Sequence, residues 1–455
     1  YIALYELYNH TNGIYWDWRE LNSSGIPWNF DTIANPCEEN WEGIQCTIKG
    51  TPPHAQYTVT GINLSTRNLT GELPSTLYNL QNLRVLNLPY NNINGTIPSS
   101  YGMLQQLQHL GLTSNELTGT IPFELKNLTS FMHLGLDFNY ITGTIPLIFY
   151  NNTSMRSILL SHNQITGTIP QIIGTLTNLV YLYLNHNYFY GEIPEILGNL
   201  TKLAYFDLDS NQLIGQIPFN FNKLIRLHFL GLHNNQLTGS IPNYISNFKH
   251  LQFLYLNNNY FTSTIPINLG NLNKLLFLHI QYNYLTGYIP YSFNNLTKIQ
   301  YLYMNNNNLI GTIPKYFSLF SELNSLLIQN NNFHGNLYNI FNSSIQINLK
   351  TIQLSHNIFT GTLPNEIFNL PKLITLIIVS TCFEGSIPNS ICNGYNLETI
   401  VLDGLRTSNT CNKVIIPGFN GKIKKTNTFY GKIPTCLFDL KGLNTLHLSG
   451  NSLTG

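Results

Sequence analysis

The sequence contains few charged residues. Asp, Glu, Lys and Arg make up 9% of its 455 residues, against roughly 25% in ordinary soluble domains. The formal net charge is +1, and the largest basic cluster, Lys422, Lys424 and Lys425, is too small to predict nucleic-acid binding. We interpret that cluster as a solvated loop. No apolar run approaches the ~20 residues of a membrane-spanning helix.

Catalytic motifs are also missing. The sequence has no nucleophile elbow, phosphate-binding loop, Gly-rich dinucleotide motif or metalloprotease helix. Asp207 and Asp209 alternate on one expected strand and are compatible with a glycosidase carboxylate pair, but we interpret them as a solvated rim. His162 and His186 recur in register without a carboxylate, which makes a poor metal site. We therefore expect no enzyme activity, catalytic residue, cofactor or metal.

The dominant feature that is present is a repeat. The phrase L-x-x-L-x-L-x-x-N-x-L-x-G-x-I-P runs, for example, from Leu107 to Pro122 and from Leu275 to Pro290. Its Asn occupies every 24th position from 91 to 331. A fixed period of this length indicates stacked units that bury their apolar faces on one another. Apolar residues, 43% of the chain, are sufficient for such a continuous core.

Each phrase predicts one coil of a solenoid. L-x-x-L-x-L is a short strand, and stacked copies form a parallel sheet whose crossover is the rest of the coil. The Asn amide is expected to pair backbone groups of its own and adjacent coils. Gly119 and its equivalents suit a turn with positive φ. Pro122 and its equivalents have no N–H and suit a side of the coil without a ladder.

With these residues the chain resembles the plant-type class of leucine-rich repeats, which includes receptor-kinase ectodomains, receptor-like proteins and polygalacturonase inhibitors. Asn35-Pro36-Cys37 followed by Trp41-Glu42-Gly43-Ile44-Gln45-Cys46 is similar to the capping motif of that class. The resemblance implies an α/β solenoid, a right-handed leucine-rich-repeat superhelix with a parallel concave β-sheet and a 3-10 or irregular convex side. It also implies an extracellular, glycosylated recognition protein, without identifying a ligand.

We expect four segments along the chain. They are an N-terminal cap at 1–56, a repeat array at 57–403, an irregular island at 404–428 and a terminal repeat at 429–455. In related receptors such an island can carry the ligand site, but we favour a disulfide-pinned loop with no special role. The chain starts at Tyr1 and stops within a repeat at Gly455, so we expect the true protein to be longer.

The cysteine count is even, which is compatible with an oxidising compartment. The six are Cys37, Cys46, Cys382, Cys392, Cys411 and Cys436. The resemblance implies that the first two pair, and the remaining four allow three pairings. Zinc binding is the competing interpretation, which the spacings and the lack of nearby His disfavour.

Glycosylation sequons point to the same compartment, the secretory pathway and the cell surface or exterior. Four of them, Asn127, Asn151, Asn199 and Asn295, differ by multiples of 24 and therefore fall in one column on the convex flank. The full set that we expect to carry N-linked glycans is Asn9, Asn22, Asn94, Asn127, Asn151, Asn152, Asn199, Asn295 and Asn342.

Outward strand positions on the expected concave side carry aromatic residues in register. Exposed rings lose free energy unless something covers them, and Tyr beside Asn and His suits recognition of a peptide or a sugar chain. The alternative is that the rings stack from coil to coil and stiffen the sheet. The predicted ligand-binding residues are Tyr181, Tyr183, Tyr205, Phe229, Phe253, Tyr255, Phe277, Tyr301 and Tyr303.

The sequence is compatible with two functions. The first is an extracellular recognition protein that binds a protein, peptide or glycan partner through its solenoid surface. The second is a structural surface or matrix glycoprotein that self-associates into fibres or filaments. The in-register aromatic residues favour the first, and the low charge and many sequons favour the second.

Overall fold

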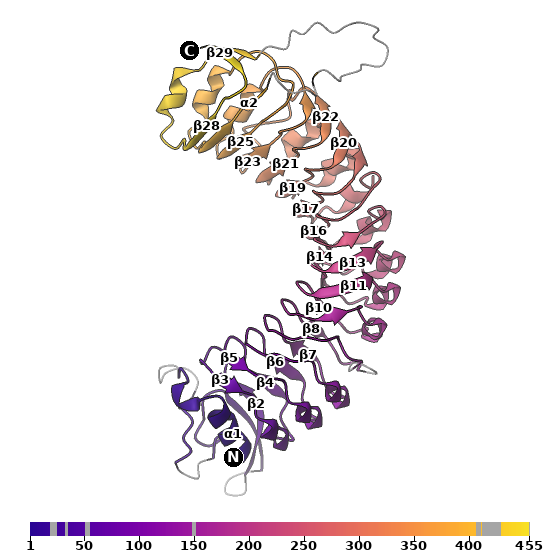
Figure 1. The fold of residues 1–455 in the computed structure, drawn as a ribbon, viewed down its shortest axis with the longest axis vertical. Helices are drawn as coiled ribbons and strands as arrows, with labels where there is room; N and C mark the ends of the chain where they lie inside the picture. Colours follow the sequence, from indigo (N-terminus) through magenta and orange to yellow (C-terminus); the bar gives the residue numbers. More distant parts are fainter. Residues whose placement is uncertain are drawn as a thin grey trace. The chain divides into compact units, whose positions relative to one another are not determined.

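The structure is a computed structural model that describes residues 1–18, 25–31, 35–50, 55–147, 152–405, 411 and 429–454. These residues belong to two compact units, Tyr1–Arg226 (unit 1) and Leu227–Gly455 (unit 2). Within each unit, successive coils stack so that a strand of one coil lies beside the strand of the next (Figure 1).

Unit 1 begins with the segment that we predicted to be a cap. Helix α1 (Ile2–His10) and the 3-10 turn η1 (Gly13–Tyr15) precede β1 (Ile44–Lys49), which pairs antiparallel with β2 (Gln56–Asn63). Strand β2 then pairs in parallel with the first repeat strand. The repeat strands of unit 1 are β4 (Val85–Asn87), β6 (His109–Gly111), β7 (His133–Gly135), β8 (Ser157–Leu159), β10 (Tyr181–Tyr183) and β12 (Tyr205–Asp207).

Short flanking strands and 3-10 turns occupy the rest of most coils in unit 1. The flanking strands are β3 (Thr70–Glu72), β5 (Asn92–Asn94), β9 (Thr166–Gly167), β11 (Tyr188–Glu192) and β13 (Gln212–Gly215). The 3-10 turns are η2 (Ser75–Asn79), η3 (Ser99–Met103), η4 (Phe123–Asn127), η5 (Gln171–Thr175), η6 (Glu195–Asn199) and η7 (Phe219–Lys223).

Unit 2 repeats this plan. Its main strands are β14 (Phe229–Gly231), β16 (Phe253–Tyr255), β17 (Phe277–His279), β19 (Tyr301–Tyr303), β21 (Ser325–Leu327), β23 (Thr351–Gln353), β25 (Thr375–Ile377), β26 (Thr399–Val401) and β28 (Thr445–His447). Its flanking strands are β15 (Gln236–Leu237), β18 (Thr286–Gly287), β20 (Asn308–Gly311), β22 (Asn332–Gly335), β24 (Ile358–Phe359), β27 (Tyr430–Lys432) and β29 (Ser452–Thr454). Its helical turns are η8 (Asn243–Asn247), η9 (Leu269–Asn271), η10 (Tyr291–Asn295), η11 (Lys315–Leu319), α2 (Asn365–Phe368), η12 (Asn389–Asn393) and η14 (Thr435–Asp439).

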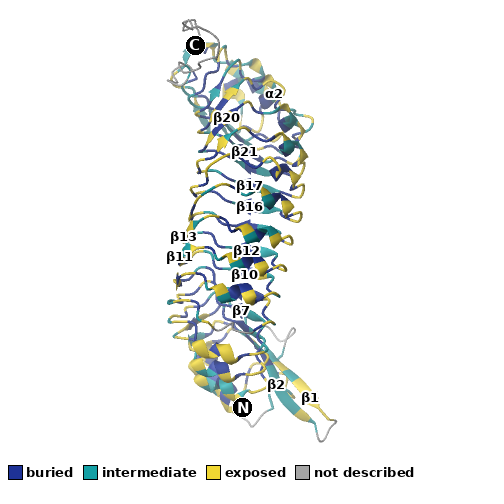
Figure 2. Ribbon diagram, turned by 90° about the vertical axis from the view of Figure 1, so that its right-hand side faces the viewer, coloured by how far each residue is buried: buried dark blue, intermediate teal, exposed yellow. Residues whose placement is uncertain are grey.

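The register of the strands follows the 24-residue period. Leu182 pairs with Phe206 in unit 1, and Leu254 pairs with Leu278 in unit 2. All four side chains are fully buried, and Figure 2 shows that buried residues recur from coil to coil. The prediction that the strand leucines point into a continuous core is confirmed within each unit. Among the described residues, no helix is long and apolar enough to cross a bilayer.

The repeated Asn connects neighbouring coils, as predicted. Asn115 is a typical case, because its Oδ1 accepts the N–H of Ile93 at 3.0 Å. Its Nδ2 donates to the carbonyl oxygens of Leu88 and Leu112, each at 3.0 Å. The side chain is almost fully buried. One amide therefore satisfies backbone groups of two coils that would otherwise remain unpaired in the core.

Turn geometry also agrees with the repeat. Gly119 has a φ of 73°, a conformation that a Cβ disfavours. In the coil where Ser263 replaces this glycine, the backbone keeps a φ of 68°, so the turn is imposed by the stack. Pro122 immediately precedes η4 with a φ of −62°, on the side of the coil where no main strand needs an N–H donor at this position.

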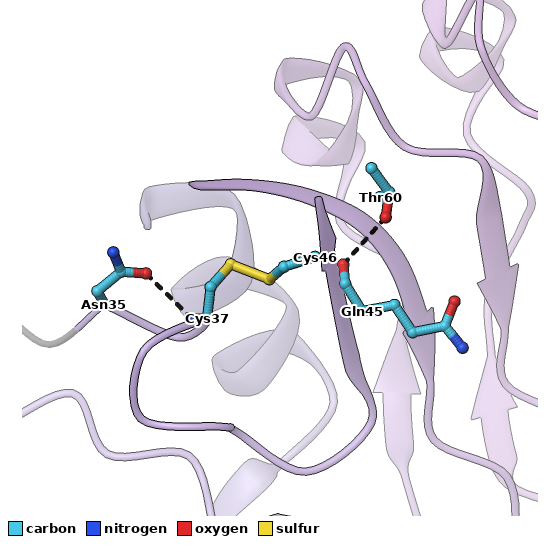
Figure 3. Close-up of a disulfide and its surroundings, with 5 residues drawn as sticks. All are labelled: Asn35, Cys37, Gln45, Cys46 and Thr60. Atoms are coloured by element: carbon cyan, nitrogen blue, oxygen red, sulfur yellow. Dashed lines mark hydrogen bonds between the residues drawn. A yellow bond between two sulfur atoms is a disulfide. The ribbon is translucent and has the colours of Figure 1, made fainter. Parts of the chain in front are cut away.

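Disulfides lie in the N-terminal segment and in the last coils. Cys37 pairs with Cys46 in the cap, where the N–H of Cys37 donates to Oδ1 of Asn35 at 3.0 Å (Figure 3). Near this bond, Oγ1 of Thr60 donates to the carbonyl of Gln45 at 3.3 Å. The four remaining cysteines, whose pairing the sequence left open, form Cys382–Cys411 and Cys392–Cys436.

The sheet continues across the interruption of the repeat after Leu402, because the strands before and after it pair directly. Strand β26 pairs in parallel with β28, so that Thr399 lies opposite Thr445. Within the segment that we expected to be an island, Gly404, Leu405 and Cys411 are described, and the rest lies outside the described residues. Cys411 carries the disulfide to Cys382, so the segment is attached to the coil at that point.

Candidate ligand-binding face

The outward side chains of the main strands, here called the strand face, are considered separately in the two units. In unit 1 the rings of Tyr181 and Tyr205 stack with centroids 5.1 Å apart and planes 12° apart. Tyr181 is 39% exposed, and Tyr183 meets it edge to face at 6.4 Å. Burial, followed by the charge of Asp207, raises the pKa of Tyr183 to about 12, so its hydroxyl stays protonated at neutral pH.

Two acidic residues on the strand face of unit 1 are less exposed than the sequence indicated. We interpreted Asp207 and Asp209 as a solvated rim, and this was wrong for Asp209, whereas Asp207 is half-buried. Asp209 is only 3% exposed, and its Oδ2 lies 3.4 Å from Nε2 of His186. Burial, followed by the charge of Asp209, raises the pKa of Asp207 to about 8. The physical reason is that side chains on adjacent strands, ~4.8 Å apart, cover one another.

A third acid, Asp137, lies three coils before Asp209. Asp137 is 7% exposed, and its Oδ1 accepts the backbone N–H of Ser161 at 2.8 Å. Burial raises the pKa of Asp137 to about 6 despite this hydrogen bond. The strand face of unit 1 therefore combines tyrosine rings with the carboxyl groups of Asp137 and Asp207, whose pKa values burial raises above the ordinary value.

The two histidines that recur in register belong to a ring stack. His162 and His186 stack with centroids 4.0 Å apart, and Phe138 stacks on His162 at 4.2 Å. All three residues have positive φ, between 52° and 54°. Burial, followed by the neighbouring His186, lowers the pKa of His162. The stack lies beside the strand face. Because its three residues are 24 positions apart, the repeat period could have identified the stack from the sequence.

In unit 2 the predicted aromatic residues form two parallel columns. In the first, Phe253 lies 5.0 Å from Phe277, which stacks on Tyr301 at 4.4 Å. Phe229 continues this column toward Phe253 at 6.0 Å. In the second, His279 lies 4.8 Å from Tyr255 and stacks on Tyr303 at 4.3 Å.

The stacking that we considered as an alternative to binding is thus present in both units. Its consequence is geometric. Where neighbouring rings are nearly parallel, at 16° for Phe277 and Tyr301, each ring face is covered by the next ring. Phe277 and Tyr301 are half-exposed as whole residues, and the edge of an aromatic ring carries the positive end of its quadrupole. Stacking therefore limits ligand contact with the ring faces and leaves contact with the ring edges open.

A row of amides beside these rings was not singled out as a site from the sequence. Its members follow successive main strands of unit 2 and are Asn257, Gln281, Asn305 and Gln329. Oε1 of Gln281, Oδ1 of Asn305 and Oε1 of Gln329 are buried and have no hydrogen-bond partner among the described residues. Nε2 of His279 is also buried and has no hydrogen-bond partner among the described residues. A buried polar atom without a partner costs about 1–3 kcal/mol, so this row favours any ligand that supplies donors.

Burial also sets the protonation state of the histidine in this region. His279 is half-buried, and its desolvation, followed by the neighbouring His233, lowers its pKa to about 4. The imidazole is therefore neutral at physiological pH. The amide row and the two aromatic columns together form an uncharged surface.

The predicted glycosylation sites differ in exposure. Asn9, Asn94, Asn127, Asn199 and Asn295 are exposed, and Asn342 is half-buried. Asn152 is 6% exposed, and its Oδ1 accepts the N–H of Ser154 at 3.1 Å, so a glycan there requires the side chain to leave this position. Asn22 and Asn151 lie outside the described residues.

Comparison with known proteins agrees with this architecture. The family model for leucine-rich repeats matches residues 129–189 and 249–309, and a second leucine-rich-repeat model matches 82–104, 106–128, 226–248 and 348–370. The chain is a leucine-rich-repeat solenoid and belongs to the plant-type class of these proteins. The comparison with curated proteins gives no match.

Solved structures give the same assignment. The chain is similar to a TDR receptor with a TM-score of 0.77 and 30% identity over 86% of this chain and 64% of the receptor chain. It is similar to the plant peptide hormone receptor RGFR1 in complex with RGF2, with a TM-score of 0.73 and 29% identity over 86% and 70% of the two chains. It is also similar to the Arabidopsis receptor kinase HAESA in complex with the peptide hormone IDA and the co-receptor SERK1. There the TM-score is 0.65 and the identity 27%, over 93% and 82% of the chains.

Proposed function

We propose that this protein is an extracellular, non-enzymatic recognition protein that binds an extended ligand on its strand face. The observation that carries the proposal is the placement of half-exposed aromatic columns beside buried polar atoms that lack partners in unit 2. A ligand that covers the rings and supplies hydrogen bonds stabilises both features at once.

Two further findings support the proposal. The three disulfides among the described residues fit an oxidising compartment. The similar receptors RGFR1 and HAESA are described in complex with peptide hormones, so a ligand-binding role has precedent in proteins of this architecture. The chain spans 64% of the length of the TDR receptor chain. That this protein binds a ligand and has partners is therefore our proposal.

The test is a selection with matched variants. The purified chain is screened against a displayed random peptide library and an array of neutral and charged oligosaccharides. Tyr181→Ser and Phe253→Ser remove one strand-face ring from each unit, and Tyr291→Ser removes a 76% exposed ring on η10. We expect ligands that bind the wild type and Tyr291→Ser, but lose binding to at least one strand-face variant.

The outcome that contradicts the proposal is binding that does not depend on the strand face. If every selected ligand binds all variants equally, the strand face is not the site. Light scattering of the same preparation distinguishes the structural alternative, because filaments of the wild type that persist in both strand-face variants favour self-assembly over recognition.

A further inference from the structure

We propose that the strand face of unit 2 is a binding site for a neutral, extended, β-linked glycan that runs across successive coils. Its hydroxyl groups donate to Gln281 and Gln329 of the amide row, and its oxygen atoms lie against the ring edges of the aromatic columns. This inference rests on the proposed function, because it names the class of ligand that the same face recognises.

Charge is the first argument. The outward strand positions of unit 2 from Phe229 to Gln329 contain no Asp, Glu, Lys or Arg. A charged ligand loses hydration at such a face and gains no ion pair in return. The strand face of unit 1 differs, because it contains Asp137, Asp207 and Asp209. An uncharged ligand is therefore the partner that fits unit 2.

Hydrogen-bonding capacity is the second argument. Among the described residues of the amide row and the second aromatic column, the buried atoms without partners are three amide oxygens, one on each of three consecutive coils, and Nε2 of the neutral His279. Amide oxygens accept hydrogen bonds and therefore require donors from the ligand. Gln281 and Gln329 are only half-buried, so rotation of their side chains can present the oxygen to a ligand. Sugar hydroxyls are donors and acceptors that reorient to suit such groups.

The ring edges supply the complementary interaction. Phe277 and Tyr301 stack at 4.4 Å, as do His279 and Tyr303 at 4.3 Å. Their edges carry positive partial charge, which attracts the oxygen atoms of a ligand. A ligand with oxygens along its whole length meets both columns and the amide row, whereas an apolar ligand leaves the amide oxygens unpaired.

Spacing distinguishes a glycan from a peptide. The amide oxygens recur once per coil, and adjacent parallel strands are ~4.8 Å apart. In an extended β-1,4-linked chain each sugar is turned over relative to the one before, so the same hydroxyl edge recurs every second sugar. That length is close to the separation of two coils, which is the separation of Gln281 and Gln329. In an extended peptide the donors on one side recur every second residue, about 6.6 Å. A peptide therefore loses register with the row after one or two coils.

The experiment measures the binding of three hexasaccharides to the full chain by isothermal titration calorimetry. Cellohexaose is the neutral β-1,4-linked probe, maltohexaose is its α-1,4-linked counterpart, and hexagalacturonate is charged. The variant Gln281→Leu/Gln329→Leu removes two acceptors, and Gln236→Leu makes the same change at an exposed position on β15. We expect cellohexaose to bind best, with affinity reduced about tenfold or more in the double variant and unchanged in Gln236→Leu.

Each of the following results overturns the inference. Failure of cellohexaose to bind, or binding of hexagalacturonate or maltohexaose with equal affinity, excludes a neutral β-linked ligand. Equal binding by wild type and double variant excludes the amide row. A selected peptide whose binding is lost in Gln281→Leu/Gln329→Leu makes the row a peptide site, and the proposed function survives while this inference fails.

Folding of the variants is controlled directly. The double variant removes unpaired buried acceptors, so its melting temperature should equal or exceed that of the wild type. If it unfolds instead, Tyr303→Leu serves as the second variant, because it removes a ring edge and a hydroxyl from the second column. Cellohexaose affinity must then fall in Tyr303→Leu, and an unchanged affinity overturns the proposal.

Discussion

Nη2 of Arg67 donates to Oε1 of Glu42 at 2.7 Å, and both side chains are almost completely buried, at 7% and 3% exposure. Nε of Arg67 donates to the same oxygen at 3.1 Å. Glu42 belongs to the capping motif around Trp41, and Arg67 lies in the first coil after β2. The ion pair therefore joins the cap to the repeat array.

We predict that Arg67→Met destabilises unit 1 by about 3–5 kcal/mol, because it leaves a buried carboxylate without its partner. Denaturant unfolding followed by fluorescence measures the change, since Trp28 and Trp41 are buried in the cap. The double variant Arg67→Met/Glu42→Gln should recover part of the loss. If Arg67→Met alone is as stable as the wild type, the pair does not hold the cap in place.

The Asn ladder gives a second prediction. Oδ1 of Asn163 accepts the N–H of Ile141 at 2.9 Å, and its Nδ2 donates to Leu136 and Leu160. Asn163→Ala leaves these buried groups unpaired, and we expect a loss of about 2–4 kcal/mol. The adjacent, exposed Gln164→Ala is the control and should change stability by less than about 0.5 kcal/mol. Equal effects of the two substitutions, measured by urea unfolding, contradict the ladder's role.

Protonation of Asp207 predicts a pH dependence. Its folded-state pKa, about 8, exceeds the ordinary value of 3.8 because of burial and Asp209. The folded state therefore binds this proton more tightly, and the resulting stability is complete below pH 4 and is lost as the pH rises through about 8. We expect the melting temperature of the wild type to fall by a few degrees between pH 6.5 and 8.5.

Asp207→Asn should flatten that decline, because the amide does not titrate. Glu116→Gln, at an exposed position of unit 1, should leave the decline unchanged. Calorimetric scans across this range decide the matter, and an identical slope in Asp207→Asn and wild type rules out Asp207 as the titrating group.

The disulfides near the end of the chain give a fourth prediction. Cys392 and Cys436 are separated by 44 residues, and the chain-entropy model assigns about 4 kcal/mol to a loop of that length. We expect Cys392→Ser/Cys436→Ser to expose the coil around β28 to hydrogen exchange, while the cap closed by Cys37 and Cys46 keeps its protection. Peptide mapping without reduction should find 37–46, 382–411 and 392–436, and any other pairing contradicts the structure.

The amino-acid sequence determined the coil and its internal chemistry. The 24-residue period predicted the strands, the bridging amide at Asn115 and the positive φ at Gly119, because these are local consequences of one repeated phrase. It also predicted the aromatic registers at Tyr181 and Phe253, since residues one period apart lie on adjacent strands.

Only the tertiary structure decided which outward residues lose contact with water. Asp209 and Asn305 occupy positions that read as solvent-exposed in the sequence, yet both are 3% exposed, because neighbouring coils are close enough for their side chains to cover them. The pairing of Cys392 with Cys436 was decided in the same way. It depends on β26 lying beside β28, a contact between segments whose separation along the chain breaks the period.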